Sequence, residues 1–311
     1  MSLHLSILNE SINHNMKKTT VGLIAALVLI ISACKTKNQE SKDIEKPIRA
    51  NDYLGQKTPR LIPEPFAPGL VTTEYWEYGG VFTPDLTEFY FLASGGEYEA
   101  STFVVFQYVD GDWVKSAVSP RVGQPTFSPD GKTMHLGRRY MEHTPTGWSE
   151  IKTMDAPFND QLIMRLSVAA NGTYYFDTYD KDNPEFPIRY SRLINGTYEE
   201  PKPLDKAINT GTQLNHPFIA PDESYLLWDA KREDGHGNSD IYISFKQKDG
   251  SWGNAINLGD KVNTDAWEAA ASVTPDGKYL FFNRNMGSDD YENVDIFWVD
   301  AQLIENLRPK S

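Results

Sequence analysis

A repeated segment constrains the fold of this 311-residue chain more than any other feature. Residues 71–85 and 262–276 are identical at seven of fifteen aligned positions, and both end in Thr-Pro-Asp. Related turns lie between them at Pro129-Asp130 and Pro221-Asp222 and, in degenerate form, at Asn171. Successive turn residues are 45, 41, 51 and 54 positions apart. A period of this length indicates a fold built from similar units.

Each unit has the pattern of four short strands. A strand of small residues precedes the turn, where proline presets φ and aspartate accepts a hydrogen bond from its own backbone. The second strand is aromatic, and a Gly turn followed by an aromatic residue opens the fourth. The aromatic second strands are expected at 89–91, 174–176, 225–228 and 279–282. Four-stranded units at this spacing predict an all-β fold, a β-propeller.

The turns predict five blades of four antiparallel strands each. The fifth unit has only its first three strands before the chain reaches residue 311. Residues 63–71, ahead of the first unit, stand where a fourth strand is expected. We therefore expect an N-terminal strand to complete the last blade and close the ring, which leaves no open sheet edge. Six blades are the alternative.

The N-terminal region has the order of a secretory signal. Two lysines, an apolar run and small residues precede Cys34, the only cysteine. Residues 31–34, Ile-Ser-Ala-Cys, resemble the bacterial lipobox, which implies cleavage before Cys34 and its lipidation. We expect an extension or mis-assigned start at 1–15, a signal peptide at 16–33, a flexible tether at 34–60 and the propeller at 61–311. Because residue 35 is not aspartate, this resemblance favours an outer-membrane lipoprotein, periplasmic or surface-facing.

Composition restricts the possible partners. The chain has 43 acidic and 30 basic residues, a formal charge of −13, which argues against binding to nucleic acid. A single cysteine excludes an intrachain disulfide. We expect a monomer held on a membrane by its lipid.

The Pro-Asp turns, the aromatic strands after them and the Asp-Ile-Tyr third strand at 240–242 resemble the TolB-like family of WD-type β-propellers. The resemblance covers about residues 60–305 and implies a propeller fold. The family includes protein-interaction modules, propellers attached to peptidases, and sugar lyases. We expect neither the extra N-terminal domain of TolB nor the hydrolase domain of the peptidases. The Gly-x-Ser-x-Gly motif of the peptidases does not occur in the sequence.

Equivalent positions in the repeats predict a ring of side chains at the channel mouth. Glu77, Glu268 and His216 are expected there from three consecutive blades, flanked by Trp76 and Trp267. Two carboxylates and an imidazole could exchange protons with a substrate. In the alternative interpretation, both glutamates accept backbone N–H groups in two similar loops, and the tryptophans fill gaps between blades. Because structure repeats and active sites usually do not, the repeated Trp-Glu pair favours that alternative.

Further candidates for binding lie in the same ring and in the loops after the second strands. The ring supplies Gln124 and Arg165. The loops are expected to carry Arg138, Arg139, Asp177, Asp229, Arg232, Asn283 and Arg284. Arginines at a channel mouth suit the carboxylates or sulfates of an acidic glycan. Residues 289–292 do not have the spacing of an EF-hand loop, so we expect no metal site there. We also expect no cofactor.

The sequence therefore predicts a membrane-anchored binding or scaffolding propeller for an envelope protein or glycan. The alternative is a glycan-active lyase or hydrolase that uses His216, Glu77 and Glu268. A third possibility is a structural role in envelope assembly, for which the exposed face needs no deep pocket.

Overall fold

The computed structural model describes residues 52–179 and 186–310. In this part of the chain almost all regular structure is β-strand, with one 3-10 helix (η1, Asp52–Gly55) and one α-helix (α1, Gln302–Leu307). The prediction of an all-β propeller fold is confirmed. The predicted signal peptide at 16–33 and the lipidation site Cys34 lie outside the described residues. No helix in the described part is long and apolar enough to cross a membrane.

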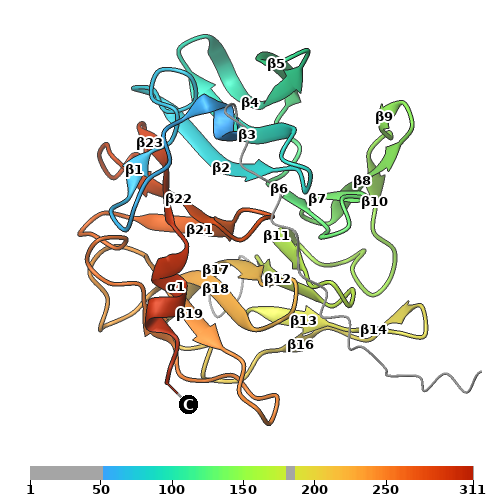
Figure 1. The fold of residues 1–311 in the computed structure, drawn as a ribbon. Coiled ribbons are helices and arrows are strands. Elements are labelled where there is room, and N and C mark those ends of the chain that lie inside the picture. Colours follow the sequence, from blue (N-terminus) through green and yellow to red (C-terminus); the bar gives the residue numbers. More distant parts are fainter. Residues whose placement is uncertain (1–51, 180–185, 311) are drawn as a thin grey trace, which may run out of the picture. The chain divides into compact units, whose positions relative to one another are not determined.

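The strands form antiparallel sheets that succeed one another in chain order (Figure 1). The first sheet contains β2 (Trp76–Phe82), β3 (Glu88–Gly95), β4 (Tyr98–Val109) and β5 (Asp112–Pro120). The second contains β6 (Pro125–Phe127), β7 (Thr133–Leu136), β8 (Arg139–Thr144), β9 (Gly147–Trp148) and β10 (Lys152–Thr153). The third contains β11 (Ile163–Val168), β12 (Tyr174–Thr178), β13 (Arg189–Ser191) and β16 (Lys202–Pro203), beside the hairpin of β14 (Leu193–Ile194) and β15 (Thr197–Tyr198).

The last two sheets complete the set. The fourth contains β17 (Thr212–Ile219), β18 (Tyr225–Lys231), β19 (Asp240–Phe245) and β20 (Ile256–Asn257). The fifth contains β21 (Glu268–Val273), β22 (Tyr279–Asn285), β23 (Val294–Asp300) and, from the other end of the sequence, β1 (Glu64–Pro65). Because β23 pairs with β2, these strands and β2–β5 form one continuous eight-stranded sheet, whose two halves we call the first and the fifth sheet.

Two pairings join the ends of the repeat array. β1 pairs antiparallel with β23, with Glu64 opposite Trp298, and β2 pairs in parallel with β23 at Trp76 and Val294. Closure of the last blade by an N-terminal strand requires the first of these pairings. The blade count and the closure of the ring stay predictions.

The turn residues all fold their chain in the same way. A side-chain oxygen of Asp85, Asp130, Asn171, Asp222 or Asp276 accepts the backbone N–H two residues further on, at 2.9–3.3 Å. This local bond is the reason Asp and Asn favour turns. The repeat seen in the sequence is therefore a repeat of one turn geometry.

Aromatic residues of the second strands are buried between sheets. Phe66, which follows β1, is fully buried and packs its ring on Phe89 of the first sheet and on Phe281 and Trp298 of the fifth. The segment next to β1 thus contributes to the core shared by the first and last sheets.

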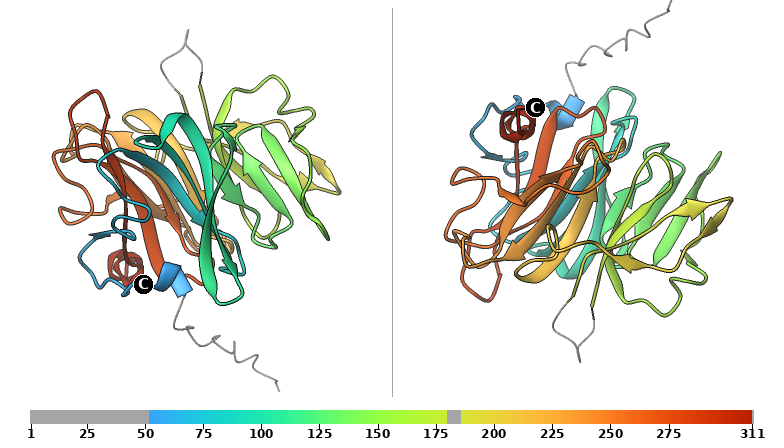
Figure 2. Two further views of the ribbon diagram at one scale, coloured as in Figure 1. Left: turned by 90° about the horizontal axis from the view of Figure 1, so that it is seen from above. Right: turned by 90° about the horizontal axis from the view of Figure 1, so that it is seen from below.

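The expected tether is shorter than predicted, because its last part packs on the folded body. Tyr53 and Leu54 of η1 are buried, and the Tyr53 hydroxyl donates to the carboxylate of Asp276 in the last Pro-Asp turn. Both views of Figure 2 place η1 and α1 toward the same side of the domain, and Figure 1 shows that they lie at different heights. No apolar periodicity marks residues 52–55, so sequence patterning could not place them in the core.

Candidate functional site

The first strands carry a β-bulge where they line the channel. The pairing register shifts within β2, β11, β17 and β21. At the bulges Gly79, His216 and Ala270 have positive φ values of 70°, 51° and 55°. A non-glycine residue in this conformation is uncommon and indicates a backbone held by its surroundings.

The bulges in β2, β17 and β21 are each hydrogen-bonded to the second strand of the preceding sheet. Asn283 Oδ1 accepts the N–H of Gly79 at 3.1 Å, Asp229 Oδ1 that of Ala270 at 2.9 Å, and Asp177 Oδ2 that of His216 at 2.8 Å. These acceptors were expected in exposed loops but lie in β22, β18 and β12 and are at most 1% exposed. They join neighbouring sheets through otherwise unpaired backbone donors.

His216 lies in a buried chain of hydrogen bonds. Its Nδ1 is 2.9 Å from Asp229 Oδ1, and its Nε2 is 3.0 Å from the hydroxyl of Tyr78 on β2. Tyr78 is 4% exposed, and burial raises the pKa of its hydroxyl. A neutral hydroxyl and a carboxylate that both bind the same imidazole fix the orientation of the ring.

Arg165 completes this cluster, which we call the channel network: Tyr78, Arg165, Asp177, His216 and Asp229. Its Nη1 donates to the carbonyl of Ala270 at 3.0 Å, and its side chain is 1% exposed. Burial lowers the pKa of the Arg165 guanidinium, and burial raises the pKa of Asp177, which accepts the N–H groups of Met164 and Arg165.

The two predicted glutamates are held by their own loops. Glu77 accepts the N–H of Thr73 at 3.0 Å and its hydroxyl at 2.6 Å, and Glu268 accepts the same two groups of Thr264 at the same distances. Burial raises the pKa of both carboxyl groups, and the threonine bonds oppose that rise. Among the described residues no hydrogen bond joins either glutamate to His216.

The predicted tryptophans flank a residue that the sequence analysis missed. Trp76 stacks on Tyr78 with ring centroids 5.3 Å apart, and Trp267 stacks on it at 6.1 Å. The guanidinium of Arg121 lies 6.0 Å from the Trp76 ring, and Tyr291 meets Trp267 edge-on at 5.3 Å. Tyr78 directly follows the candidate Glu77, so its side chain lies on the opposite face of β2. Its place between the two tryptophans is evident only from the pairing of the strands in the structure.

The remaining predicted binding residues are dispersed. Arg138 and Arg139 donate to the carbonyls of Asn159 and Val122, and Arg232 pairs with Asp234 at 3.1 Å. Arg284 pairs with Glu268 at 2.8 Å, and Gln124 is buried. The structure does not gather these groups into one pocket.

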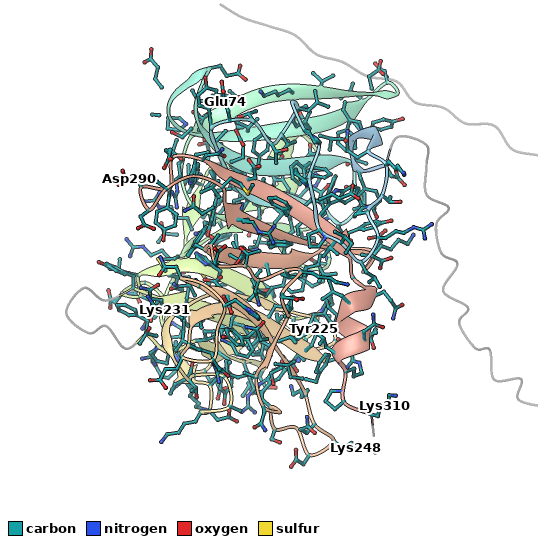
Figure 3. The ribbon with its side chains drawn as sticks, turned by 90° about the vertical axis from the view of Figure 1, so that its left-hand side faces the viewer. Glu74, Tyr225, Lys231, Lys248, Asp290 and Lys310 are labelled. Carbon is teal, nitrogen blue, oxygen red and sulfur yellow. The ribbon has the colours of Figure 1, made fainter. Side chains whose placement is uncertain are left out.

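A groove lies at the mouth end, where β2 begins. This aromatic groove has a volume of about 360 Å³ and is lined by Tyr75, Trp76, Ser94, Gly95, Ser101, Arg121, Tyr291 and Glu292. In Figure 3, Glu74 and Asp290, the neighbours of Tyr75 and Tyr291, lie on one side of the domain, and Tyr225 and Lys310 lie on the opposite side. Of the groove residues, only Trp76 was predicted to bind a ligand. Tyr75 lies in the repeated segment 71–85 but is replaced by Ala266 in the second copy, and residues 289–292 were considered only as a metal loop.

No three His, Cys, Asp or Glu side chains gather as a metal site within residues 52–179 and 186–310.

No protein-family model matches the chain, and no curated protein matches it. Among solved structures, the chain is similar to TolB from Acinetobacter baumannii, with 15% identity and a TM-score of 0.44 over 73% of this chain and 57% of that one. It is also similar to the catalytic domain of the Coprinopsis cinerea GH62 α-L-arabinofuranosidase, with 12% identity and a TM-score of 0.49 over 78% and 96% of the two chains. The third is XC5397 from Xanthomonas campestris, titled a gluconolactonase, with 10% identity and a TM-score of 0.47 over 78% and 94%.

Proposed function

We propose that this protein is a non-catalytic, lipid-anchored propeller of the cell envelope that binds an acidic glycan in the aromatic groove. The observation that carries the proposal is the conjunction of Tyr75, Trp76 and Arg121 at one groove. Tyr75 is 40% exposed, and Arg121 forms no ion pair with the described residues, although its guanidinium lies over Trp76. Aromatic faces suit the C–H faces of sugar rings, and a guanidinium suits a carboxylate.

Other groove residues supply the hydrogen-bonding groups that a sugar needs. The hydroxyl of Ser101 is buried without a partner, and the Tyr291 hydroxyl accepts from Asn238. The volume of about 360 Å³ falls within the usual range of about 300–1,000 Å³ for small-molecule sites. A short stretch of one oligosaccharide is the ligand that this groove best fits.

A catalytic role finds less support. A general acid or base must reach the substrate. Glu77 and Glu268 are engaged by Thr73 and Thr264, and His216 is buried between Tyr78 and Asp229. The lyase or hydrolase alternative predicts that these three side chains converge in one pocket, and no hydrogen bond among the described residues joins either glutamate to His216.

Calorimetric titration of the mature protein with an oligogalacturonate and a neutral cello-oligosaccharide tests the glycan proposal. We expect binding of the acidic oligosaccharide, reduced at least tenfold by Arg121→Ala and by Tyr75→Ala. Arg192→Ala is the matched control, because Arg192 pairs with Glu199 on the third sheet, away from the groove. Equal losses in all three variants, or cleavage of the oligosaccharide, would contradict the proposal.

The proposed lipid anchor at Cys34 is tested separately. Cys34→Ser removes the thiol that a lipid would occupy. We expect the wild-type protein in the membrane fraction and the variant in the soluble fraction, because acyl chains provide the proposed anchorage. Equal membrane retention of both proteins would contradict the proposed lipid anchor at Cys34 and would not affect the proposal that the groove binds a glycan.

A further inference from the structure

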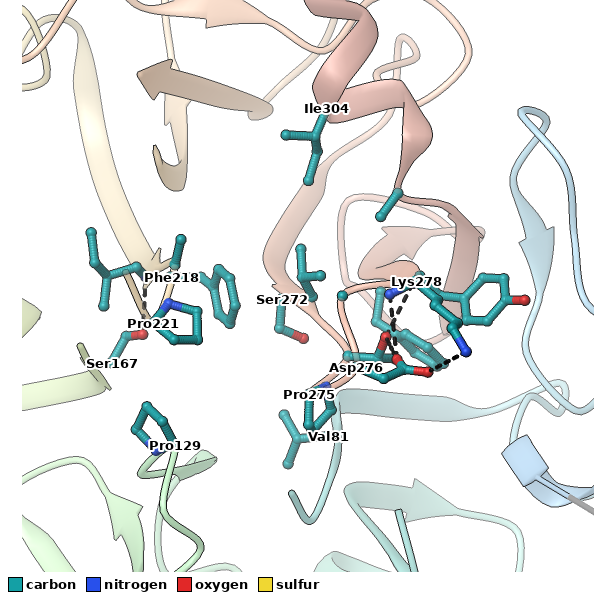
Figure 4. A pocket seen from close by; sticks show the side chains of 18 of the residues that line it. Val81, Pro129, Ser167, Phe218, Pro221, Ser272, Pro275, Asp276, Lys278 and Ile304 are labelled. Atoms are coloured by element: carbon teal, nitrogen blue, oxygen red, sulfur yellow. Dashed lines mark hydrogen bonds and ion pairs between the residues drawn. The ribbon is translucent and has the colours of Figure 1, made fainter. Parts of the chain in front are cut away.

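A second, larger cavity lies at the other end of the channel (Figure 4). This turn-side cavity has a volume of about 940 Å³ and is ringed by the turn prolines of four sheets, Pro84, Pro129, Pro221 and Pro275. It contacts the last residues of β2, whereas the aromatic groove contacts the first. The cavity is therefore separate from the groove proposed for glycan.

The walls of the turn-side cavity are mostly apolar. Val81, Phe218 and Val273 come from the first strands of three sheets, and Ile304 of α1 lies at its edge. Figure 4 shows Val81, Phe218 and Ile304 around the same space. Such walls suit an apolar ligand body.

The floor is formed in part by Arg165, whose donors are not all used. Arginine has five N–H donors. The structure gives the Arg165 side chain one hydrogen bond, from Nη1 to Ala270, and its Nε is buried without a partner. Asp177 and Asp229 attract the guanidinium, but their oxygens accept backbone N–H groups and the His216 ring. Unsatisfied buried donors are costly and call for an acceptor.

Two hydroxyl groups line the cavity with Arg165. Ser167 Oγ accepts the N–H of Ile219 at 3.0 Å, which leaves its own proton to donate. Ser272 Oγ has no hydrogen-bond partner among the described residues, and Figure 4 shows both serines at the cavity. Donors beside apolar walls favour a ligand with an acceptor at one end.

The acidic groups at the rim are engaged in their own turns and pairs. Asp222 and Asp300 accept the N–H groups of Ser224 and Gln302. Asp276 pairs with Lys278, and Glu305 pairs with Arg308. Of the cationic residues that line the cavity, Lys278 and Arg308 pair with these acids, and Arg165 does not.

We propose that the turn-side cavity binds a small organic acid, with the carboxylate at Arg165, Ser167 and Ser272 and the apolar body between Val81, Phe218 and Pro275. A guanidinium and hydroxyl groups are the donors that a carboxylate prefers. This site is independent of the proposed glycan groove, so either can fail alone.

The test is calorimetric titration of the mature protein with octanoate and, as the uncharged match, 1-octanol. We expect octanoate to bind at least tenfold more tightly than octanol. Ser272→Leu fills the cavity and keeps the buried Arg165, and it should weaken octanoate binding at least tenfold. Ser116→Leu, at an exposed position of β5, is the control and should bind like the wild type.

Arg165→Gln tests the charge directly, with its melting temperature measured first because Arg165 is buried. If Arg165→Gln does not fold, Ser272→Leu still decides. Equal binding of octanoate and octanol, or unchanged binding by Ser272→Leu, would overturn the proposal. A tetrapeptide with a free C-terminus that binds tenfold more tightly than octanoate, and loses this on amidation, would overturn the assignment to a small acid.

Discussion

At the scale of single residues, the role of a buried polar side chain depends on its hydrogen-bond partners. Glu77 and Glu268 have the types and spacing of catalytic acids, yet each carboxylate is used by a threonine four residues earlier. His216, which repeats in no other unit, reaches across to another sheet at Tyr78, as Arg165 does at Ala270. The repeated Trp-Glu pair in two units was the sequence signal for a structural role.

The Asp177 carboxylate tests how much one such acceptor contributes. It accepts the N–H groups of Met164, Arg165 and His216. Asp177→Ala leaves these donors buried without an acceptor, so we expect the free energy of unfolding to fall by about 3 kcal/mol. Urea denaturation measures it, with Asp260→Ala on the exposed surface as control. A loss no larger than that of the control would contradict the linking role of Asp177.

Asp295 on β23 predicts a pH dependence. Burial and the nearby Glu77 raise the pKa of Asp295 to about 6. Between about pH 4 and pH 6 the folded state therefore holds a proton that the unfolded state has lost, and the free energy of unfolding falls as pH rises through this window.

Asp295→Asn should remove this contribution, raise the melting temperature at pH 7 and flatten its pH profile between pH 4 and pH 7. Thermal unfolding in a buffer series measures both. Asp289→Asn, at an exposed position, should leave the profile as in the wild type. A parallel profile for the Asp295 and Asp289 variants would mean that Asp295 does not titrate in this window.

At the scale of elements, the short β1 contributes through the residue that follows it. Phe66 packs between the first and fifth sheets. We expect Phe66→Ala to cost about 3–5 kcal/mol, because it removes a fully buried ring. Ile62→Ala, at a position 56% exposed, should cost less than about 0.5 kcal/mol. Similar unfolding curves for the two variants would show that the segment next to β1 is not part of the core.

The strands themselves were accessible to prediction because their signals are local. Aromatic second strands and the turn residues Asp85, Asp130, Asp222 and Asp276 were recognised from sequence and occupy β-strands and turns as expected. The fourth strands are more broken than predicted: β9 and β10 both pair with β8. Such interruptions depend on the edge of one particular sheet and leave no pattern in the sequence.

At the scale of the whole molecule, the folded body begins earlier than the repeat indicates. Tyr53 reaches Asp276 across more than two hundred residues of sequence. A chain that starts at Asp52 should keep the melting temperature of the full chain. A chain that starts at Leu70, without Tyr53 and Phe66, should melt about 10 °C lower or more, since about 2–4 °C accompany each kcal/mol in domains of this size. Calorimetry of both chains measures this, and equal melting temperatures would refute the early boundary.

The sequence by itself determined the fold class, the unit length and the turn geometry, because proline, aspartate and strand alternation act within a few residues of the chain. It also predicted that Trp76 and Arg165 lie near a channel mouth. Only the tertiary structure decided what these residues touch. The bond from His216 to Tyr78, the guanidinium of Arg121 over Trp76 and the docking of Tyr53 on Asp276 join distant segments. Such contacts depend on how one sheet is set against another, and no local pattern encodes that placement.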